Sequence, residues 1–255
     1  MNAIHRVGFI GLGAMGAPMA GHLYAKDMLA AVGNRTPAKA EALAAQLGVT
    51  AAMTPSDFAG CDAVVLCVSM DADVMQCCRD LAGVLAAGTL VIDHSTIARE
   101  TALAAAALLA ESGIAFLDAP VSGGVEGARN GKLSVMVGGE ADVLARAQEL
   151  LSAYALRVTH MGPTGAGQAT KAVNQVLVAG IAQAASGVYI ACDEAQSPLL
   201  KKAIKCASKF DSRIEEVQTL LGRIFKRRFP SPILEAVGTF LGPPFVGAPV
   251  TSRNM

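Results

Sequence analysis

The sequence lacks the two kinds of apolar segment that direct a chain into or across a membrane. Although 53% of its 255 residues are hydrophobic, no run of 18 consecutive apolar residues occurs, which argues against a transmembrane helix. The N-terminus has no basic stretch followed by an apolar run and a cleavage site, so no secretory signal is expected. We therefore expect a cytoplasmic protein without a membrane partner.

Signs of a metal centre or a disulfide framework are also missing. The chain has six cysteines and four histidines, and none of them follows a metal-ligand spacing. The cysteines lie at positions 61, 67, 77, 78, 192 and 206. We expect reduced thiols and no metal site.

The chain has no net charge, but its charge is unevenly distributed. Residues 1–200 carry 11 basic and 17 acidic side chains, whereas residues 201–255 carry 10 basic and 4 acidic ones. A basic end of this kind either binds a polyanion or forms the solvated face of a helix. The solvated face is the more common case, and no nucleic-acid partner is expected.

A glycine-rich motif stands near the N-terminus. Residues 7–10 predict a short apolar strand, Gly11, Gly13 and Gly16 match G-x-G-x-x-G, and residues 17–24 suit a helix. In this context the motif predicts a dinucleotide site, with the pyrophosphate at the helix N-terminus. The alternative is a tight turn without a ligand. The residues expected to contact the cofactor here are Gly11, Leu12, Gly13, Ala14, Met15 and Gly16.

Strands and helices are expected to alternate after this motif, which predicts a doubly wound, mostly parallel sheet of the Rossmann type. The expected strands cover residues 28–33, 62–68, 89–93, 114–118, 133–137 and 156–159, and the expected helices cover 37–47, 71–86, 97–111 and 141–153. Residues 165–191 predict one long helix that is apolar on all sides and therefore buried.

We therefore place a boundary at about residue 162, between a dinucleotide-binding domain (1–162) and a small all-α region (163–255). Three prolines predict an irregular tail from about residue 241.

The end of the second expected strand bears on the choice of dinucleotide. An acidic residue there bonds the ribose 2′-hydroxyl of NAD, but this chain has Asn34, Arg35 and Thr36. A guanidinium with two neighbouring donors suits the 2′-phosphate of NADP. The alternative is an exposed arginine in a loop.

Two later stretches supply candidate chemistry. Residues 118–124 stand at the end of a strand, and Ser122 with two glycines could hold a carboxylate, although a structural turn is the simpler interpretation. In residues 165–175, Lys171 shares one helix face with Asn174 and Gln175. A buried lysine has a lowered pKa and could act as a general acid and base, or it could form a structural salt bridge.

These motifs, in this order and spacing, resemble the β-hydroxyacid dehydrogenases, which include 3-hydroxyisobutyrate dehydrogenase and tartronate semialdehyde reductase. The similar segments are residues 9–19, 34–36, 118–124, 131–139 and 165–175. Asn34-Arg35-Thr36 looks like the NADP-preferring branch of glyoxylate and succinic semialdehyde reductases. The resemblance covers roughly residues 5–185 and implies hydride transfer between nicotinamide and the β carbon of a small hydroxyacid or semialdehyde.

The resemblance also implies roles for individual residues. Lys171 would be the general acid and base, Asn174 would orient it or the substrate, and Ser122, Gly123 and Gly124 would bind the substrate carboxylate. The residues that look like contacts of the nicotinamide ribose are Val68, Ser69, Met70, Ser95 and Thr96. The expected cofactor is NADP, with NAD as the alternative.

The family has a larger all-α domain that also forms its dimer interface, and residues beyond about 185 do not resemble it. We expect a divergent or shortened C-terminal region, and a homo-oligomer if its helices fold. Two hypotheses follow: an NADP-preferring dehydrogenase, or a dinucleotide-binding homologue with impaired catalysis and a scaffold or interaction role.

Overall fold

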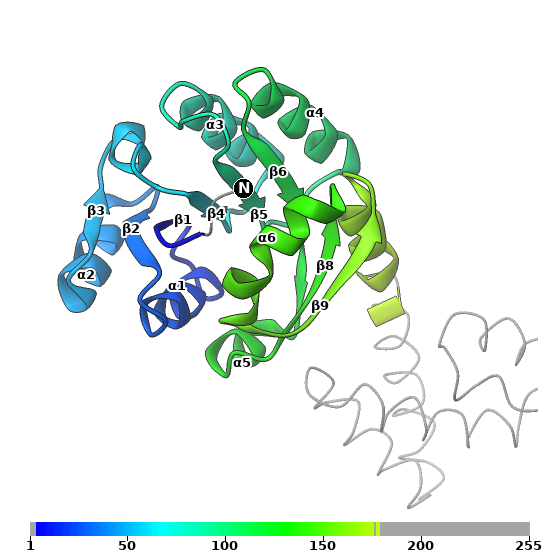
Figure 1. Ribbon diagram of the computed structural model, residues 1–255. Coiled ribbons are helices and arrows are strands. Elements are labelled where there is room, and N and C mark those ends of the chain that lie inside the picture. Colours follow the sequence, from blue (N-terminus) through cyan, green and yellow to red (C-terminus); the bar gives the residue numbers. More distant parts are fainter. Residues whose placement is uncertain (1–3, 176, 179–255) are drawn as a thin grey trace, which may run out of the picture. The chain divides into compact units, whose positions relative to one another are not determined.

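The computed structural model describes residues 4–175, 177 and 178, and all but the last two belong to one compact unit, Met1–Val176. Within these residues strands and helices alternate along most of the chain (Figure 1). The strands are β1 (Val7–Ile10), β2 (Leu29–Gly33), β3 (Thr50–Ala52), β4 (Ala63–Leu66), β5 (Leu90–Asp93), β6 (Ala115–Asp118), β7 (Val121–Ser122), β8 (Leu133–Gly138) and β9 (Ala155–Gly162). The helices are α1 (Gly16–Tyr24), α2 (Pro37–Leu47), the 3-10 helix η1 (Pro55–Phe58), α3 (Asp71–Ala82), α4 (Arg99–Ala110), α5 (Gly124–Arg129) and α6 (Ala141–Ser152), and a further helix covers residues 166–175.

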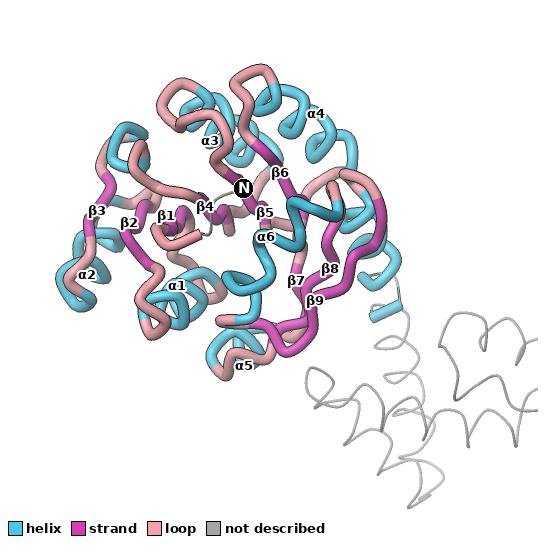
Figure 2. The backbone as a smooth tube through the Cα atoms, in the orientation of Figure 1, coloured by secondary structure: helices cyan, strands magenta, loops and turns pink. Residues whose placement is uncertain are grey.

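The strands form one sheet, drawn in magenta in Figure 2. Its order is β3-β2-β1-β4-β5-β6-β8-β7, and β9 pairs with β8. The six strands from β3 to β6 in this order are mutually parallel, whereas β8 is antiparallel to both β6 and β7. The chain order reverses between β1 and β4, and ligands of such sheets bind outside the carboxyl ends of the strands at this switch point.

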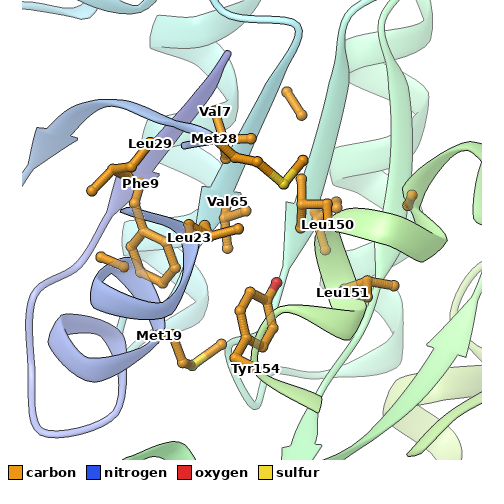
Figure 3. Packing of buried hydrophobic residues seen from close by; sticks show 14 of the residues in the cluster. Val7, Phe9, Met19, Leu23, Met28, Leu29, Val65, Leu150, Leu151 and Tyr154 are labelled. Carbon is orange, nitrogen blue, oxygen red and sulfur yellow. The ribbon is translucent and has the colours of Figure 1, made fainter. Parts of the chain in front are cut away.

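Both faces of the sheet are covered by helices, because its central strands are apolar on both sides. Helices α1, α2 and α6 contribute buried residues to one core cluster, and α3 and α4 contribute to the other. Figure 3 shows the first cluster, in which Met19 and Leu23 of α1 and Leu150 of α6 pack together with Tyr154. The two cores hold the strand ends in fixed positions, and these ends carry the polar residues described below.

The predicted Rossmann-type, mostly parallel sheet is confirmed. Each expected strand and helix before residue 162 is present, with bounds shifted by a few residues. Four short elements were not predicted: β3, η1, β7 and α5. Each has six residues or fewer, so none is long enough to show the periodicity on which a prediction rests.

The prediction that the helix after residue 165 is buried on all sides is wrong for its described turns. Ala169, Ala172, Val173 and Gln175 are exposed, although Lys171 is buried. An apolar composition on every face therefore did not mean burial on every face. The rest of the predicted helix, the basic segment 201–255 and the proline-rich tail lie outside the described residues, and the boundary near residue 162 stays a prediction.

Four of the six cysteines lie in the described part of the chain, and all four are free thiols. Burial raises the pKa of Cys61 and Cys77 to about 11, and that of Cys67 and Cys78 to about 12. A protonated thiol is a poor nucleophile, so these side chains act as small apolar groups. None of the described helices is both long and apolar enough to cross a membrane.

Candidate functional site

The three glycines of the turn between β1 and α1 meet different requirements. Gly11 has φ +102°, a left-handed value suited to glycine, and an added Cβ would collide with the Cys67 carbonyl. An added Cβ on Gly16 would collide with the Gly11 carbonyl, because helix and turn are in direct contact. An added Cβ on Gly13 would have no protein atom within 4 Å. The fold therefore needs Gly11 and Gly16, whereas a glycine at position 13 suits the close approach of a ligand.

Asn34 joins this turn to the segment that follows β2. Its Oδ1 accepts a hydrogen bond from the Leu12 N–H at 2.9 Å, and its Nδ2 donates to the Thr36 carbonyl at 3.1 Å. The N-cap residue of α1, Met15, makes no side-chain hydrogen bond to the first turn. The turn is thus held in place. In the first turn of α1, Pro18 has no N–H and the Ala17 N–H donates to the Gly13 carbonyl at 3.1 Å, so the Gly16 N–H is the first-turn donor that an anion could bind.

Arg35 and Thr36 are the exposed residues of the predicted 2′-phosphate segment, and Arg35 carries its charge. Its side chain is 82% exposed, and its Nη1 lies 3.4 Å from both carboxylate oxygens of Asp73 on α3. An exposed ion pair of this length stabilises a protein by about 1 kcal/mol or less. Arg35 can therefore exchange this carboxylate for another anion at little cost.

The segments after β4 and β5 are joined by backbone-to-side-chain hydrogen bonds. The Val68 N–H donates to Ser95 Oγ at 2.9 Å, and the Ser95 N–H donates to Asp93 Oδ1 at 2.9 Å. Ser69, Met70 and Thr96 of these segments are exposed. The structure thus brings the two predicted ribose-contacting segments together, at the same edge of the sheet as the glycine-rich turn.

Asp93 is a fully buried carboxyl group at the end of β5. Its Oδ2 has no hydrogen-bond partner among the described residues. Burial raises the pKa of Asp93 from 3.8 to about 7, opposed by hydrogen bonds from Ser95 and reinforced by the charges of Asp118 and Asp71. The group therefore titrates near neutral pH at the centre of the predicted cofactor edge.

The Asp93→Asn variant should be more stable than the parent protein at pH 8, with the difference vanishing towards pH 4. Below the unfolded pKa of 3.8 the carboxyl is protonated in both states. As the pH rises to about 7, the unfolded chain releases this proton first, so the parent loses stability by up to roughly 4 kcal/mol. The asparagine side chain has no titratable proton in this pH range, so the stability of the variant does not change for this reason. Thermal denaturation from pH 4.5 to 8.5 measures the difference. The exposed Asp80→Asn is the matched control, and a pH-independent gap for Asp93→Asn would contradict the assignment.

A buried His94–Tyr154 pair supports the segment that leads to Ser122, Gly123 and Gly124, the predicted carboxylate-binding residues. His94 Nδ1 lies 2.6 Å from the Ala119 carbonyl oxygen, and Nε2 lies 2.7 Å from the Tyr154 hydroxyl. A carbonyl only accepts, so Nδ1 carries the proton, and the tyrosine hydroxyl donates to Nε2. Burial lowers the pKa of His94 to about 4, which keeps the ring neutral. The Ala119 carbonyl is thus fixed by an uncharged, fully satisfied network.

The predicted carboxylate-binding residues lie where β7 ends and α5 begins. Ser122 pairs with Ser134 of β8 in an antiparallel register. Gly123 and Gly124 have φ values of +124° and +59°, which glycine adopts readily. All three residues are half-buried, so none of them is closed off completely from solvent.

Lys171 lies against this motif. Its side chain is 8% exposed, and its Nζ donates to the Val121 carbonyl at 2.8 Å. The structure therefore brings Lys171 beside the residue that precedes Ser122, fifty positions earlier in the chain. Asn174 and Gln175 are less closely placed. The Asn174 amide donates to the Gln175 side chain at 3.5 Å rather than to the substrate motif, and Gln175 is exposed.

Gln168 connects the lysine-bearing helix to the predicted ribose segment. The buried side chain donates to the Ser95 carbonyl at 2.7 Å and accepts from the Ile97 N–H at 3.2 Å. Through Gln168 and Lys171, this one helix thus contacts both the segment after β5 and Val121, the residue that precedes the 122–124 motif.

Sequence reasoning missed four buried polar residues of this region: Asp93, His94, Tyr154 and Gln168. A weak signal was present for Asp93, because it ends an apolar strand of the sheet, where ligands bind. The His94–Tyr154 contact spans 60 residues, and no local pattern predicts it.

Comparison with known proteins shows the family to which this chain belongs. A family model described as the NAD binding domain of 6-phosphogluconate dehydrogenase matches residues 6–162. The solved 3-hydroxyisobutyrate dehydrogenase of Mycobacterium tuberculosis with L-serine is 34% identical and has a TM-score of 0.71, over 77% of this chain and 68% of that chain. The chain belongs to the β-hydroxyacid dehydrogenase family.

Two curated relatives agree with this membership. An uncharacterized oxidoreductase of Shewanella frigidimarina is 44% identical over 73% of this chain and 66% of its own length. An NAD-dependent L-serine dehydrogenase of Pseudomonas aeruginosa is 41% identical over 68% of this chain and 59% of its own length. The match spans less than two thirds of either relative. The predicted family and its NAD(P)-binding domain are confirmed.

Proposed function

We propose that this β-hydroxyacid dehydrogenase is an NADP-preferring enzyme that uses Lys171 as its general acid and base. The substrate would be a small β-hydroxyacid or the corresponding semialdehyde. The observation that carries the proposal is the buried Lys171 ammonium, which donates to the Val121 carbonyl next to Ser122. A cation held at the start of the carboxylate-binding motif is well placed to meet the reacting oxygen of a small acid.

The glycine-rich turn and the N-terminus of α1 would hold the cofactor pyrophosphate. The open space beside Gly13 supports this fit, because no protein atom competes for it. Val68, Ser69, Met70 and Thr96 would contact the nicotinamide ribose. When bound, the cofactor supplies a hydride donor or acceptor at C4 of the nicotinamide.

Lys171 would act on the oxygen of the reacting carbon. During reduction its ammonium gives a proton to the carbonyl oxygen, and during oxidation the neutral amine takes the hydroxyl proton. Ser122 and the N–H groups of Gly123 and Gly124 would hold the substrate carboxylate. Asn174 would orient the substrate or the lysine, after turning from its long contact with Gln175.

The preference for NADP rests on the segment after β2. Residues 34–36 include no acidic residue to bond a ribose 2′-hydroxyl, and the Arg35 side chain can leave Asp73 because their contact is long and exposed. One curated relative is named an NAD-dependent enzyme, so NAD is the alternative to be tested.

The test combines turnover with cofactor preference. We expect the full chain to oxidise NADPH with glyoxylate, succinic semialdehyde or tartronate semialdehyde, or to reduce NADP with L-serine. Arg35→Ala should raise the KM for NADPH by about tenfold or more, since a charge-assisted pair is lost, and leave the KM for NADH within about twofold. Absorbance at the NADPH band reports both.

Arg79→Ala on α3 is the control for this experiment, because it removes an exposed arginine that has no place in the predicted cofactor site. Equal increases in the KM for NADPH and in the KM for NADH in Arg35→Ala would refute the NADP preference. Binding of NADPH without turnover of any of these substrates would refute the proposed dehydrogenase activity and would favour a dinucleotide-binding protein.

A further inference from the structure

Asp118, at the end of β6, binds the start of the helix that carries Lys171. Its Oδ1 accepts a hydrogen bond from the Gly165 N–H at 2.6 Å, and its Oδ2 accepts one from the Gln168 N–H at 2.9 Å. The residue is completely buried. One side chain of the sheet thus satisfies two backbone donors that lie 47 and 50 positions further along the chain.

These two hydrogen bonds complete a capping box from outside the helix. Gly165 is the N-cap residue, because its carbonyl accepts the first helical hydrogen bond, from the Ala169 N–H at 3.0 Å. In an ordinary capping box, the N-cap side chain binds the N–H of the third helical residue, whose side chain binds the N-cap N–H. Gly165 has no side chain, and the Gln168 side chain is bound to the segment after β5. Asp118 therefore performs both functions, and the helix dipole favours its charge.

Close packing fixes the helix start against the sheet. An added Cβ on Gly138 would lie 2.8 Å from the Gly167 nitrogen and would also collide with Asp118. An added Cβ on Gly167 would lie 2.6 Å from the Asp118 carbonyl oxygen. Two glycines are thus required for the carboxylate to reach the helix N-terminus.

We infer that Asp118 is a positioning residue for Lys171, an inference that rests on the proposed function of this lysine. Residues 118–121 contact the helix twice, through the Asp118 carboxylate at its N-terminus and through the Val121 carbonyl at the Lys171 Nζ. Ser122 follows directly. Since a helix is stiff, holding its first turn fixes the lysine, six residues beyond the N-cap, relative to the substrate motif.

The Asp118→Asn variant tests this inference. Asparagine keeps one acceptor but turns an NH₂ group towards the second backbone N–H, so the cap is half lost. We expect kcat to fall roughly 10- to 100-fold, because a misplaced catalytic group reacts more slowly. The Kd for NADPH should stay within about twofold. Amide hydrogen exchange over residues 166–175 should become faster, whereas exchange over β1 and α1 should not change.

Two further variants complete the experiment. Asp142→Asn removes an exposed carboxylate from the first turn of α6 and should change neither kcat nor exchange over residues 166–175. Asp118→Glu keeps both acceptor oxygens, should retain more kcat than the asparagine variant, and serves in its place if Asp118→Asn does not fold.

Unchanged exchange over residues 166–175 in Asp118→Asn would overturn the capping inference. So would unchanged exchange in Asp118→Glu, because its extra methylene must displace the helix start in this tightly packed place. Faster exchange with an unchanged kcat would overturn the positioning role. If the parent protein turns over no substrate, the proposed function fails together with the positioning role, and exchange alone decides whether Asp118 caps the helix.

Discussion

Replacing Lys171 with methionine should lower kcat by about 100- to 10,000-fold, the range measured when a general acid or base is removed. Methionine keeps most of the apolar stem, so the packing of this 8%-exposed side chain is largely preserved. The Kd for NADPH should stay within about twofold, because the residues predicted to bind the cofactor lie on other segments. Steady-state kinetics and a fluorescence titration of NADPH measure the two quantities.

Lys26→Met is the matched control for this variant. Lys26 is an exposed lysine between α1 and β2, away from the carboxyl ends of the strands, and its replacement should leave kcat unchanged. Turnover that survives the loss of Lys171 undiminished would refute the mechanism. If Lys171→Met loses both its turnover and its ability to bind NADPH, the substitution has instead damaged the whole domain.

Replacing Gly13 with alanine should weaken NADPH binding by about tenfold or more without lowering the melting temperature, a change of at least roughly 1.4 kcal/mol in binding. The added methyl meets no protein atom within 4 Å, so folding has no reason to suffer. It would, however, occupy the space that a pyrophosphate needs for close approach. Calorimetric titration and thermal denaturation separate the two effects.

Two other glycines provide matched controls. Gly21 of α1 also faces open space, and Gly21→Ala should keep NADPH binding and raise stability by about 0.5–1 kcal/mol through helix propensity. Gly16→Ala places a methyl on the Gly11 carbonyl and should destabilise the fold by about 1–3 kcal/mol or more. Parent-like NADPH binding by Gly13→Ala would show that this turn does not hold a pyrophosphate.

The sheet could be predicted from the sequence because its strands are short apolar runs separated by helical patterns. β4 and β5, for example, consist wholly of buried residues, as expected of parallel strands covered on both faces. β7 was missed because a strand of two residues is defined only by its pairing with β8 and leaves no pattern in the sequence. The exposed face of the helix after residue 165 was missed because its alanines and valine do not differ from buried ones in sequence.

The candidate site was predictable only where its residues belong to local motifs. The glycine-rich turn, Asn34-Arg35-Thr36 and Ser122-Gly123-Gly124 are continuous in sequence, whereas the partners of Lys171, His94 and Asp118 lie about 25 to 60 residues away. Such contacts arise from the topology, because β5, β6 and the helix after residue 165 meet at one edge of the sheet. The position of Asp93 and Asp118 at the ends of buried strands was their only signal in the sequence, and neither was predicted as a site residue.

The neutral His94 has a consequence for regulation by acidity. Because this imidazole takes up a proton only near pH 4, moderate acidification does not break its bonds to Ala119 and Tyr154. The scaffold beneath the predicted substrate-binding segment is thus insensitive to the pH changes that histidines commonly sense. If the proposed reaction is found to change its rate between about pH 5 and pH 8, we expect the change to originate in other groups, such as Asp93.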